Sequence, residues 1–219
     1  LRWMNCIGGV RRDLTRDQIQ RLDAVMTVVG DQFEKLMDLI LSSASTVDRL
    51  ERTGILTPEI AKDLGVVGVA GRASGINLDV RRDHPYAFYD QVTFRVPVYT
   101  EGDVLHRLKA RADEVRESLA IIQQVVKAMA SRKTSASNDE IAAAWKTLPP
   151  NRCALGFVEG WRGEIIHWVR TTADNRLARC KIKDPSFQNW PALSEAILGN
   201  IVPDFPVVNK SFNLSYSGT

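Results

Sequence analysis

The sequence predicts an α+β fold that is mostly helical, with two long antiparallel core helices and a small antiparallel β-meander. Apolar residues recur at spacings of three and four between Ile19 and Ile40, and again between Leu105 and Val126, which is typical of one buried helix face. After Cys153 the pattern changes to the alternation of apolar and polar residues that indicates strands. Helices followed by adjacent strands favour an α+β arrangement.

The first long helix is expected to begin after Thr15, because Thr15 and Gln18 have the spacing of a capping box. Asp103 is expected to cap the second long helix, which we expect to pack antiparallel against the first. The expected core stripe of the first helix comprises Ile19, Leu22, Met26, Val29, Phe33, Leu36 and Ile40.

Between the two long helices, the sequence predicts three shorter features. Thr57-Pro58-Glu59 begins a short helix that ends at Gly65, with proline at the first helical position. Residues 65–79 contain four glycines and are expected to form a compact loop. Residues 92–98 alternate between apolar and polar, which predicts a half-buried strand, and Pro97 places it at a sheet edge.

The C-terminal third predicts a meander of three strands at Leu155–Glu159, Glu164–Arg170 and Leu177–Ile182, joined by tight turns. A short helix is expected before it, at Asp139–Lys146, and another after it, near Trp190–Leu198. The tail that follows contains two prolines and is expected to be mostly extended or irregular.

These elements suggest one folding unit with two parts. Residues 1–150 are expected to form a helical core with a glycine- and arginine-rich loop at 65–90, and residues 151–219 to add the meander and a C-terminal segment. No apolar run approaches the roughly 20 residues that are needed to span a bilayer.

Composition excludes several classes of protein. The net charge of +3 is too small for the dense basic surface typical of nucleic-acid binding, so we expect no nucleic-acid partner. The three cysteines, Cys6, Cys153 and Cys180, are too far apart in sequence for a disulfide framework or a close-spaced metal site. They are instead typical of a reducing, cytoplasmic compartment.

Two segments combine charge with glycine. Residues 71–86 contain three arginines, two acidic residues and a tyrosine, which fits either a structural ion-pair network or the wall of a buried redox or ligand cavity. In residues 158–168, Arg162 is expected at the tip of a hairpin, either exposed or projecting into a cavity, and Gly163 permits close approach of a bulky group. His167 lies between two apolar residues and is expected to be a core histidine.

Several short motifs follow one another in order along the chain. They are Gly8-Gly9-Val10, Gly71-Arg72-Ala73-Ser74-Gly75, Asp79, Arg81, Pro85-Tyr86, Tyr89-Asp90, Gly102-Asp103, Arg107, Arg111, Glu114, Ser118, Glu159, Arg162-Gly163-Glu164 and Asp184-Pro185-Ser186-Phe187. Together they resemble the large subunit of nickel–iron hydrogenases and the related hydrogenase-like (49-kDa-type) subunit of respiratory complex I. The membrane-bound, formate-hydrogenlyase-type branch is the most similar. The resemblance implies a C-terminal half to two-thirds of such a subunit, with the N-terminal part absent.

In the hydrogenases of this family, a C-terminal CxxC supplies two thiolates to nickel and iron, which favour soft ligands. The corresponding stretch here, residues 209–215, has no cysteine, and Ser211 and Leu214 fall roughly at the thiolate positions. The resemblance therefore implies that the nickel–iron centre is lost, so that this chain provides no metal ligand and binds no cofactor by itself. It also implies an iron–sulfur cluster in a neighbouring subunit and a possible quinone.

The resemblance also assigns candidate site residues. Arg162 matches the family arginine that overhangs the nickel–iron site, where a guanidinium can stabilise charge that develops on reduction, and with Glu164 it forms the candidate catalytic pair. The candidate cofactor-binding residues are Arg72, Asp79, Arg81 and Ser211, and the family motif gives the first three a mainly architectural role.

The function that the resemblance implies is that of a subunit of a membrane-associated oxidoreductase complex. It would help to transfer electrons between an iron–sulfur small subunit and a quinone-like or other acceptor, in a peripheral arm attached to membrane subunits at the cytoplasmic face of the inner membrane. Two alternatives stay open: a nickel–iron hydrogenase large subunit, which requires four thiolates, and a non-catalytic scaffold. Absence of the N-terminal part would expose apolar surface, which predicts self-association.

Overall fold

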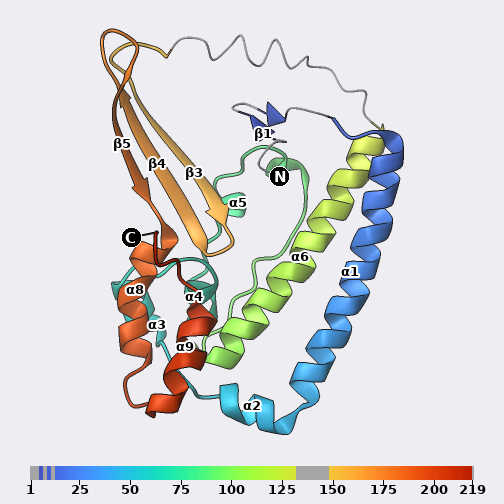
Figure 1. Ribbon diagram of the computed structural model, residues 1–219, viewed down its shortest axis with the longest axis vertical. Helices are drawn as coiled ribbons and strands as arrows, with labels where there is room; N and C mark the ends of the chain where they lie inside the picture. Colours follow the sequence, from blue (N-terminus) through green and yellow to red (C-terminus); the bar gives the residue numbers. More distant parts are fainter. Residues whose placement is uncertain (1–4, 7–8, 11–12, 132–147, 219) are drawn as a thin grey trace.

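Two long helices form the framework of the molecule. The computed structural model describes residues 5–6, 9–10, 13–131 and 148–218. Helix α1 (Arg16–Ser42) and helix α6 (Val104–Ser131) run antiparallel and side by side, as the sequence predicts (Figure 1). The expected capping box of α1 is present: the Thr15 hydroxyl accepts from the Gln18 N–H, and the Gln18 side chain accepts from the Thr15 N–H.

The predicted core stripe of α1 is wrong in part. The face toward α6 passes through Gly30, whose Cα position leaves room for the Leu119 side chain, and through Met37, which is buried. Val29 and Leu36 point away instead, and Leu36 is 51% exposed. The reason is that α1 carries apolar residues on two sides, whereas only one side packs against α6. The exposed apolar residues of α1 are Val25, Val28, Val29, Leu36, Leu39 and Leu41.

Four short helices and one 3₁₀ turn connect α1 to α6. They are α2 (Ala44–Leu50), α3 (Pro58–Asp63), α4 (Gly68–Ala73), α5 (Val80–Asp83) and η1 (Tyr89–Gln91). Helix α3 begins at Pro58 and is followed by Gly65 as predicted. The loop expected at residues 65–79 is instead partly helical, because every residue of α4 is buried and its backbone groups require internal partners.

The strand predicted at residues 92–98 is absent from the described structure. This segment is extended, but it has no strand beside it. Its backbone bonds to side chains of α6 instead: the Thr93 N–H donates to the Gln124 side chain and the Arg95 N–H donates to the Glu117 carboxylate, each at 2.9 Å. Alternation therefore predicted the local conformation correctly, whereas the partner is a helix and not a sheet.

The predicted meander is confirmed. Strands β3 (Cys153–Gly160), β4 (Gly163–Thr171) and β5 (Leu177–Lys183) form an antiparallel sheet in the order β3-β4-β5. The sheet extends away from the helices, with the β3–β4 turn at the helical end (Figure 1). A separate two-stranded pairing joins β1 (Asn5–Cys6) to β2 (Gly9–Val10).

The C-terminal segment is more helical than predicted. It forms α8 (Pro185–Ala196), η2 (Val202–Asp204) and α9 (Phe205–Phe212). Pro203 and Pro206 lie in the first turns of η2 and α9, where a missing N–H costs nothing, so the two prolines begin helices here. The helix predicted at Asp139–Lys146 lies outside the described residues.

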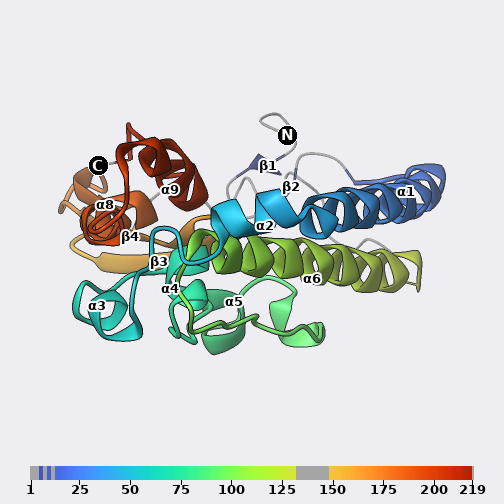
Figure 2. The same ribbon diagram turned by 90° about the horizontal axis from the view of Figure 1, so that it is seen from below.

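The main hydrophobic core lies where α3, α4, α8, α9 and the start of α6 meet. Figure 2 shows α8 and α9 on one side of the start of α6, and α3 to α5 on the other. Leu56, Val66 and Val208 are essentially inaccessible in this core. No helix in the described ranges is both long and apolar enough to cross a lipid bilayer.

Candidate functional site

The turn between β3 and β4 packs directly against the start of α4. Gly160 pairs with Gly163, which leaves Trp161 and Arg162 as the two residues of the turn. A Cβ on Gly163 would lie 2.8 Å from the Gly68 nitrogen, and a Cβ on Gly68 would overlap the Arg162 carbonyl. Both glycines also have positive φ. The close approach predicted at Gly163 is thus to the backbone of α4, and it fixes the position of the turn.

On one side of the turn, two arginines are bound by carboxylates. Arg72 is 1% exposed, and its guanidinium lies 2.7 Å from Glu114, 2.9 Å from Glu159 and 3.8 Å from Asp79. Arg81 contacts both oxygens of Asp79, at 3.0 and 2.6 Å. We call Arg72 and Arg81 the carboxylate-bound arginines. They join α4, α5, α6 and β3 in one network.

Burial and ion pairing have opposite effects on the pKa values of the residues in this network. Burial lowers the pKa of Arg72, but Glu114, Glu159 and Asp79 outweigh it, so that the pKa lies above its ordinary value. Burial also raises the pKa of the Glu159 carboxyl, and the neighbouring Arg72 does not fully reverse that effect. Glu159 therefore binds a proton more readily than an exposed glutamate does.

On the other side of the turn, three arginines are bound by neutral oxygens; we call Arg107, Arg111 and Arg162 the carbonyl-bound arginines. Arg107 is 0% exposed and donates to the Ser211 hydroxyl and to two backbone carbonyls, at 2.6 to 2.8 Å. Arg111 donates to the Ser211 carbonyl, and Arg162 donates from Nε to the Asn213 carbonyl at 2.6 Å. Among the described residues, no carboxylate forms an ion pair with any of the three.

Positive charge therefore gathers near the C-terminal end of α9 without an ion pair to a described carboxylate. Burial lowers the pKa of Arg107 to about 9. Burial also lowers the pKa of Arg111; the nearby Glu114 carboxylate opposes this in part, and the charge on Arg162 adds to it. The Nε of Arg111 is buried and has no hydrogen-bond partner in the described part of the chain. An anion bound next to Arg107 and Arg111 would stabilise their charged forms and give the Arg111 Nε a hydrogen-bond partner.

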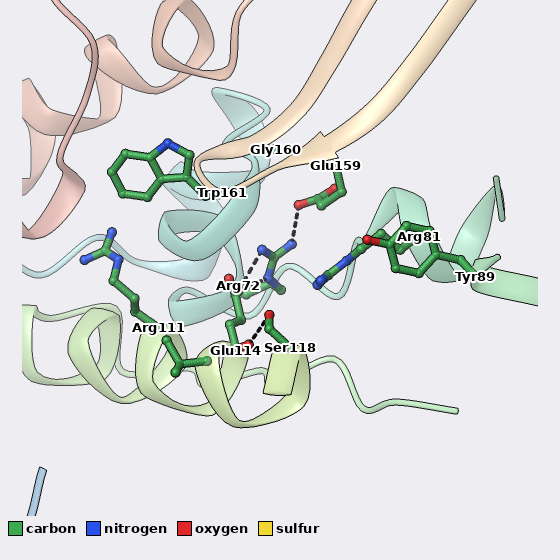
Figure 3. Close-up of a pocket in the computed structure, with 10 residues that line it drawn as sticks. Arg72, Arg81, Tyr89, Arg111, Glu114, Ser118, Glu159, Gly160 and Trp161 are labelled. Carbon is green, nitrogen blue, oxygen red and sulfur yellow. Dashed lines mark hydrogen bonds and ion pairs between the residues drawn. The ribbon is translucent and has the colours of Figure 1, made fainter. Parts of the chain in front are cut away.

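Trp161 lies beside two of the carbonyl-bound arginines. The Arg162 guanidinium stacks over its ring at 4.0 Å from the centroid, and that of Arg111 lies at 5.9 Å. Figure 3 shows Trp161 at the end of the turn, with Arg111 directed toward it and Arg72 between Glu159 and Glu114. The Trp161 side chain is 54% exposed, so that its ring is accessible.

A cavity of about 330 Å³ opens beside these groups, and its size is within the range of small-molecule sites. Its wall combines the carboxylate-bound arginines with Arg111 of the other group. The lining residues are Arg72, Arg81, Tyr89, Arg111, Glu114, Val115, Ser118, Glu159, Gly160 and Trp161. Residues 71–86 therefore form both an ion-pair network and a cavity wall, the two interpretations that the sequence allows.

The structure brings some predicted site residues together and separates others. Arg72, Asp79 and Arg81 form one network, and Ser211 contacts the other arginine group. Arg162 is half-buried and binds the C-terminal segment, so it is not an exposed tip residue. Glu164 forms an ion pair with Lys183 at 3.1 Å, and no described contact joins it to Arg162.

Sequence analysis assigned no site role to Arg107, Arg111, Glu114 or Ser118, although all four belong to the motif series. They lie at spacings of four, three and four along α6 and so share one face of that helix. A polar stripe on a largely buried helix was the available signal. The prediction for His167 is wrong: it is exposed, because no described element covers that part of the sheet.

The described residues do not fit a thiolate-bound nickel–iron centre. Cys153 and Cys180 are exposed in the sheet, on opposite faces, and the Ser211 hydroxyl is already bound by Arg107 and the Val208 carbonyl. Within the part of the chain that the structure describes, no cluster of three or more histidine, cysteine, aspartate or glutamate side chains could hold a metal ion.

Comparison with known proteins agrees with this fold. The family model of the 49-kDa subunit of respiratory-chain NADH dehydrogenase matches residues 2–219. Formate hydrogenlyase subunit 5 of Escherichia coli is 34% identical, over 99% of this chain and 37% of its own length. NADH-quinone oxidoreductase subunit 4 of Thermus thermophilus is 30% identical, over 94% of this chain and 56% of its own length.

The fold is also that of a solved respiratory complex. A chain of the membrane-bound sulfane sulfur reductase, an archaeal respiratory membrane complex, superposes with a TM-score of 0.84 at 26% identity, over 95% of this chain and 57% of that one. The chain thus spans between about a third and somewhat more than half of the length of these relatives. It belongs to the family of the 49-kDa subunit of respiratory-chain NADH dehydrogenase.

Proposed function

We propose that the protein acts as a subunit of a membrane-associated oxidoreductase complex, in which electrons pass between an iron–sulfur partner subunit and a quinone-like or other acceptor. The relatives support this proposal, since they include a subunit of an NADH-quinone oxidoreductase and a chain of a respiratory membrane complex. The observation that carries it is the positive charge of the carbonyl-bound arginines, which have no ion pair among the described residues, beside this cavity.

The chemical role of that charge follows from its position. An acceptor that gains electrons becomes more negative, and fixed positive groups that already point at it favour the reduced form. Arg111 lines the cavity, and Arg162 holds Trp161 at its edge. Because both guanidinium groups are fixed by backbone carbonyls, little reorganisation is needed when the charge develops. Glu159, with its raised pKa, is placed to hold a proton at the opposite wall.

We place the protein in a peripheral arm at the cytoplasmic face of the inner membrane, in contact with membrane subunits and an iron–sulfur small subunit. No step in this proposal runs through a nickel–iron centre, and we propose that these described residues hold no cofactor without a partner. The residues that would contact the acceptor are Arg111, Glu159 and Trp161.

Replacement of Arg162 tests the proposal in the full-length subunit, assembled in its complex. Arg162→Met is expected to lower quinone-reductase turnover about 10- to 100-fold, and Arg162→Lys less, because lysine keeps the charge and loses the planar stacking. The subunit ratio of the complex is the control for assembly. Unchanged turnover in Arg162→Met would support the non-catalytic scaffold instead.

A nickel–iron hydrogenase large subunit is the second candidate, favoured by the formate hydrogenlyase relative. It requires thiolates that the described residues do not supply near Ser211. Elemental analysis of the full-length subunit, purified with its iron–sulfur partner, separates the two. Stoichiometric nickel would restore the hydrogenase function. Absence of nickel, with all iron explained by the clusters of the partner, would favour the quinone-like acceptor.

A further inference from the structure

The far end of the β3–β5 sheet projects beyond the helices and is exposed on both faces (Figure 1). Its near end is anchored: Phe157 packs edge-on against His84, which follows α5, with ring centroids 5.0 Å apart, and Glu159 binds Arg72. A three-stranded sheet needs a hydrophobic face or a helix packed against it to be stable in water, and no described helix covers this end. This end of the sheet therefore needs a surface to pack against.

The basic side chains at the far end of the sheet lie on one of its faces. Residues directly opposite one another in antiparallel strands point to the same face. Cys153 lies opposite Arg170, which lies opposite Arg179, and Leu155 lies opposite Trp168, which lies opposite Lys181. We call the face formed by these six residues the basic face.

The charge of the basic face is unpaired. No acidic residue in the described ranges forms an ion pair with Arg170, Arg179 or Lys181. Lys183, the next basic residue of β5 on this side, does have a partner, Glu164. The opposite face of the same strands carries Val169, Cys180 and Ile182 and has no such row of charges. The charge is thus confined to one face and to one end of the sheet.

We infer that the basic face docks against an acidic surface of a neighbouring protein subunit. Leu155, which is 58% exposed, lies on the edge strand β3, Trp168 and Arg170 lie on the central strand β4, and Arg179 and Lys181 lie on the other edge strand, β5. Aromatic residues and arginine are enriched at protein interfaces relative to the rest of the surface. The inference rests on the proposed function only in that both place the chain in a multi-subunit complex.

Docking on the basic face would also affect the cavity, because the two surfaces are adjacent. The basic face continues along β3 through Phe157 to Glu159, which lines the cavity. A subunit bound there would lie beside α5 and would hold the carboxylate-bound arginines in place from the outside. Docking would therefore connect assembly of the complex with the shape of the cavity.

The two exposed cysteines test the inference without any substitution, since Cys153 belongs to the basic face and Cys180 to the opposite one. The intact complex is labelled with a maleimide, and each rate is divided by the rate for the same cysteine in the denatured chain. We expect Cys153 to react about tenfold or more slowly than Cys180. Equal rates, or a slower Cys180, would overturn the inference.

A lipid surface is separated from a protein surface by repeating the labelling in detergent and in vesicles that contain phosphatidylglycerol. Protection of Cys153 in detergent supports a subunit contact, and protection that arises only in the vesicles overturns it. Turnover is measured on the same samples, so loss of the docking and loss of the proposed electron transfer are observed independently.

Charge reversal then tests the basic residues themselves. The double variant Arg179→Glu and Lys181→Glu is expected to remove the protection of Cys153 and to release a subunit at lower salt than the unmodified complex. The matched control, Arg16→Glu and Arg21→Glu, reverses two exposed charges at the start of α1 and is expected to change neither. Persistent protection of Cys153 in the first variant would contradict the role assigned to these charges.

Discussion

Arg72 and Arg107 are both fully buried, and their surroundings have opposite consequences. Three carboxylates surround Arg72, and its pKa lies above the ordinary value despite burial. Arg107 has no ion pair with any described residue. It donates to oxygens of Gly54, Gly102 and Ser211 and lies over the Phe212 ring, and burial lowers its pKa to about 9. Equal burial thus gives a buried ion pair in one case and a buried cation without an ion pair in the other.

The two groups of arginines have different roles in the same site. The carboxylate-bound arginines satisfy all their charges within the chain, so their role is to hold α4, α5, α6 and β3 together. The carbonyl-bound arginines leave positive charge unsatisfied, which destabilises the protein alone and favours an anion at the cavity. The β3–β4 turn touches both groups and keeps them apart.

The largest expected effect is on the carboxylate-bound side. Arg72→Met leaves Glu159 and Glu114 buried without their partner, so the free energy of unfolding should fall by about 3–5 kcal/mol. Urea denaturation measures the change. Arg95→Met is the control, because its ion pair with Glu117 is on the surface and should contribute about 1 kcal/mol or less. A loss below about 1 kcal/mol for Arg72→Met would remove the distinction between the groups.

A smaller effect is expected where the turn meets α4. Gly68→Ala places a methyl group against the Arg162 carbonyl at a positive φ, so the turn must move, and stability should fall by about 2 kcal/mol or more. Gly156→Ala, in the same sheet, meets no atom within 4 Å and should have little effect. Equal behaviour of the two variants in urea would show that the turn is not held as described.

Arg107→Met is expected to cost less than Arg72→Met, about 1–2 kcal/mol, because it leaves no carboxylate unpaired and removes a buried cation. The loss comes from the three oxygens that Arg107 binds. Thermal or urea unfolding beside Arg72→Met gives the ranking. A larger loss for Arg107→Met would mean that its charge is compensated after all.

The smallest effect is on pH dependence. Above about pH 9 the folded protein releases the Arg107 proton, while the unfolded chain retains it, so stability rises with pH in this window. The stability of the unmodified protein minus that of Arg107→Met should increase by about 1 kcal/mol between about pH 8 and about pH 9.7. The subtraction removes groups common to both, such as Tyr99, whose pKa burial raises to about 12. A constant difference would show that burial does not lower the Arg107 pKa.

Sequence patterns predicted correctly those features that depend on residues close together in the sequence. The capping box at Thr15 and the three strands are encoded by local spacing, and both are confirmed. Helix α4 and the extended residues 92–98 depend on what surrounds them, so the glycines of the first predicted a loop and the alternation of the second predicted a strand in a sheet. The apolar residues of α1 were assigned to one stripe although they lie on two sides, because periodicity does not show which side has a partner.

The residues of the site likewise differ in whether the sequence alone could predict their contacts. Arg72, Asp79 and Arg81 lie close together in sequence, and their network was foreseen as one possibility. The carbonyl-bound arginines require the C-terminal segment to turn back from α9 toward α6, which no local pattern indicates. The expected self-association stays a prediction, and the exposed apolar side of α1 is the surface that would mediate it.

The most direct measurement compares two arginines that line the same cavity, one from each group. Arg111→Met and Arg81→Met are each made in the full-length subunit, and quinone-reductase turnover is measured in the assembled complex. We predict that Arg111→Met lowers turnover about tenfold or more with the complex intact, whereas Arg81→Met acts mainly on stability and assembly. Unchanged turnover in Arg111→Met would contradict the claim that uncompensated positive charge at this cavity serves electron transfer.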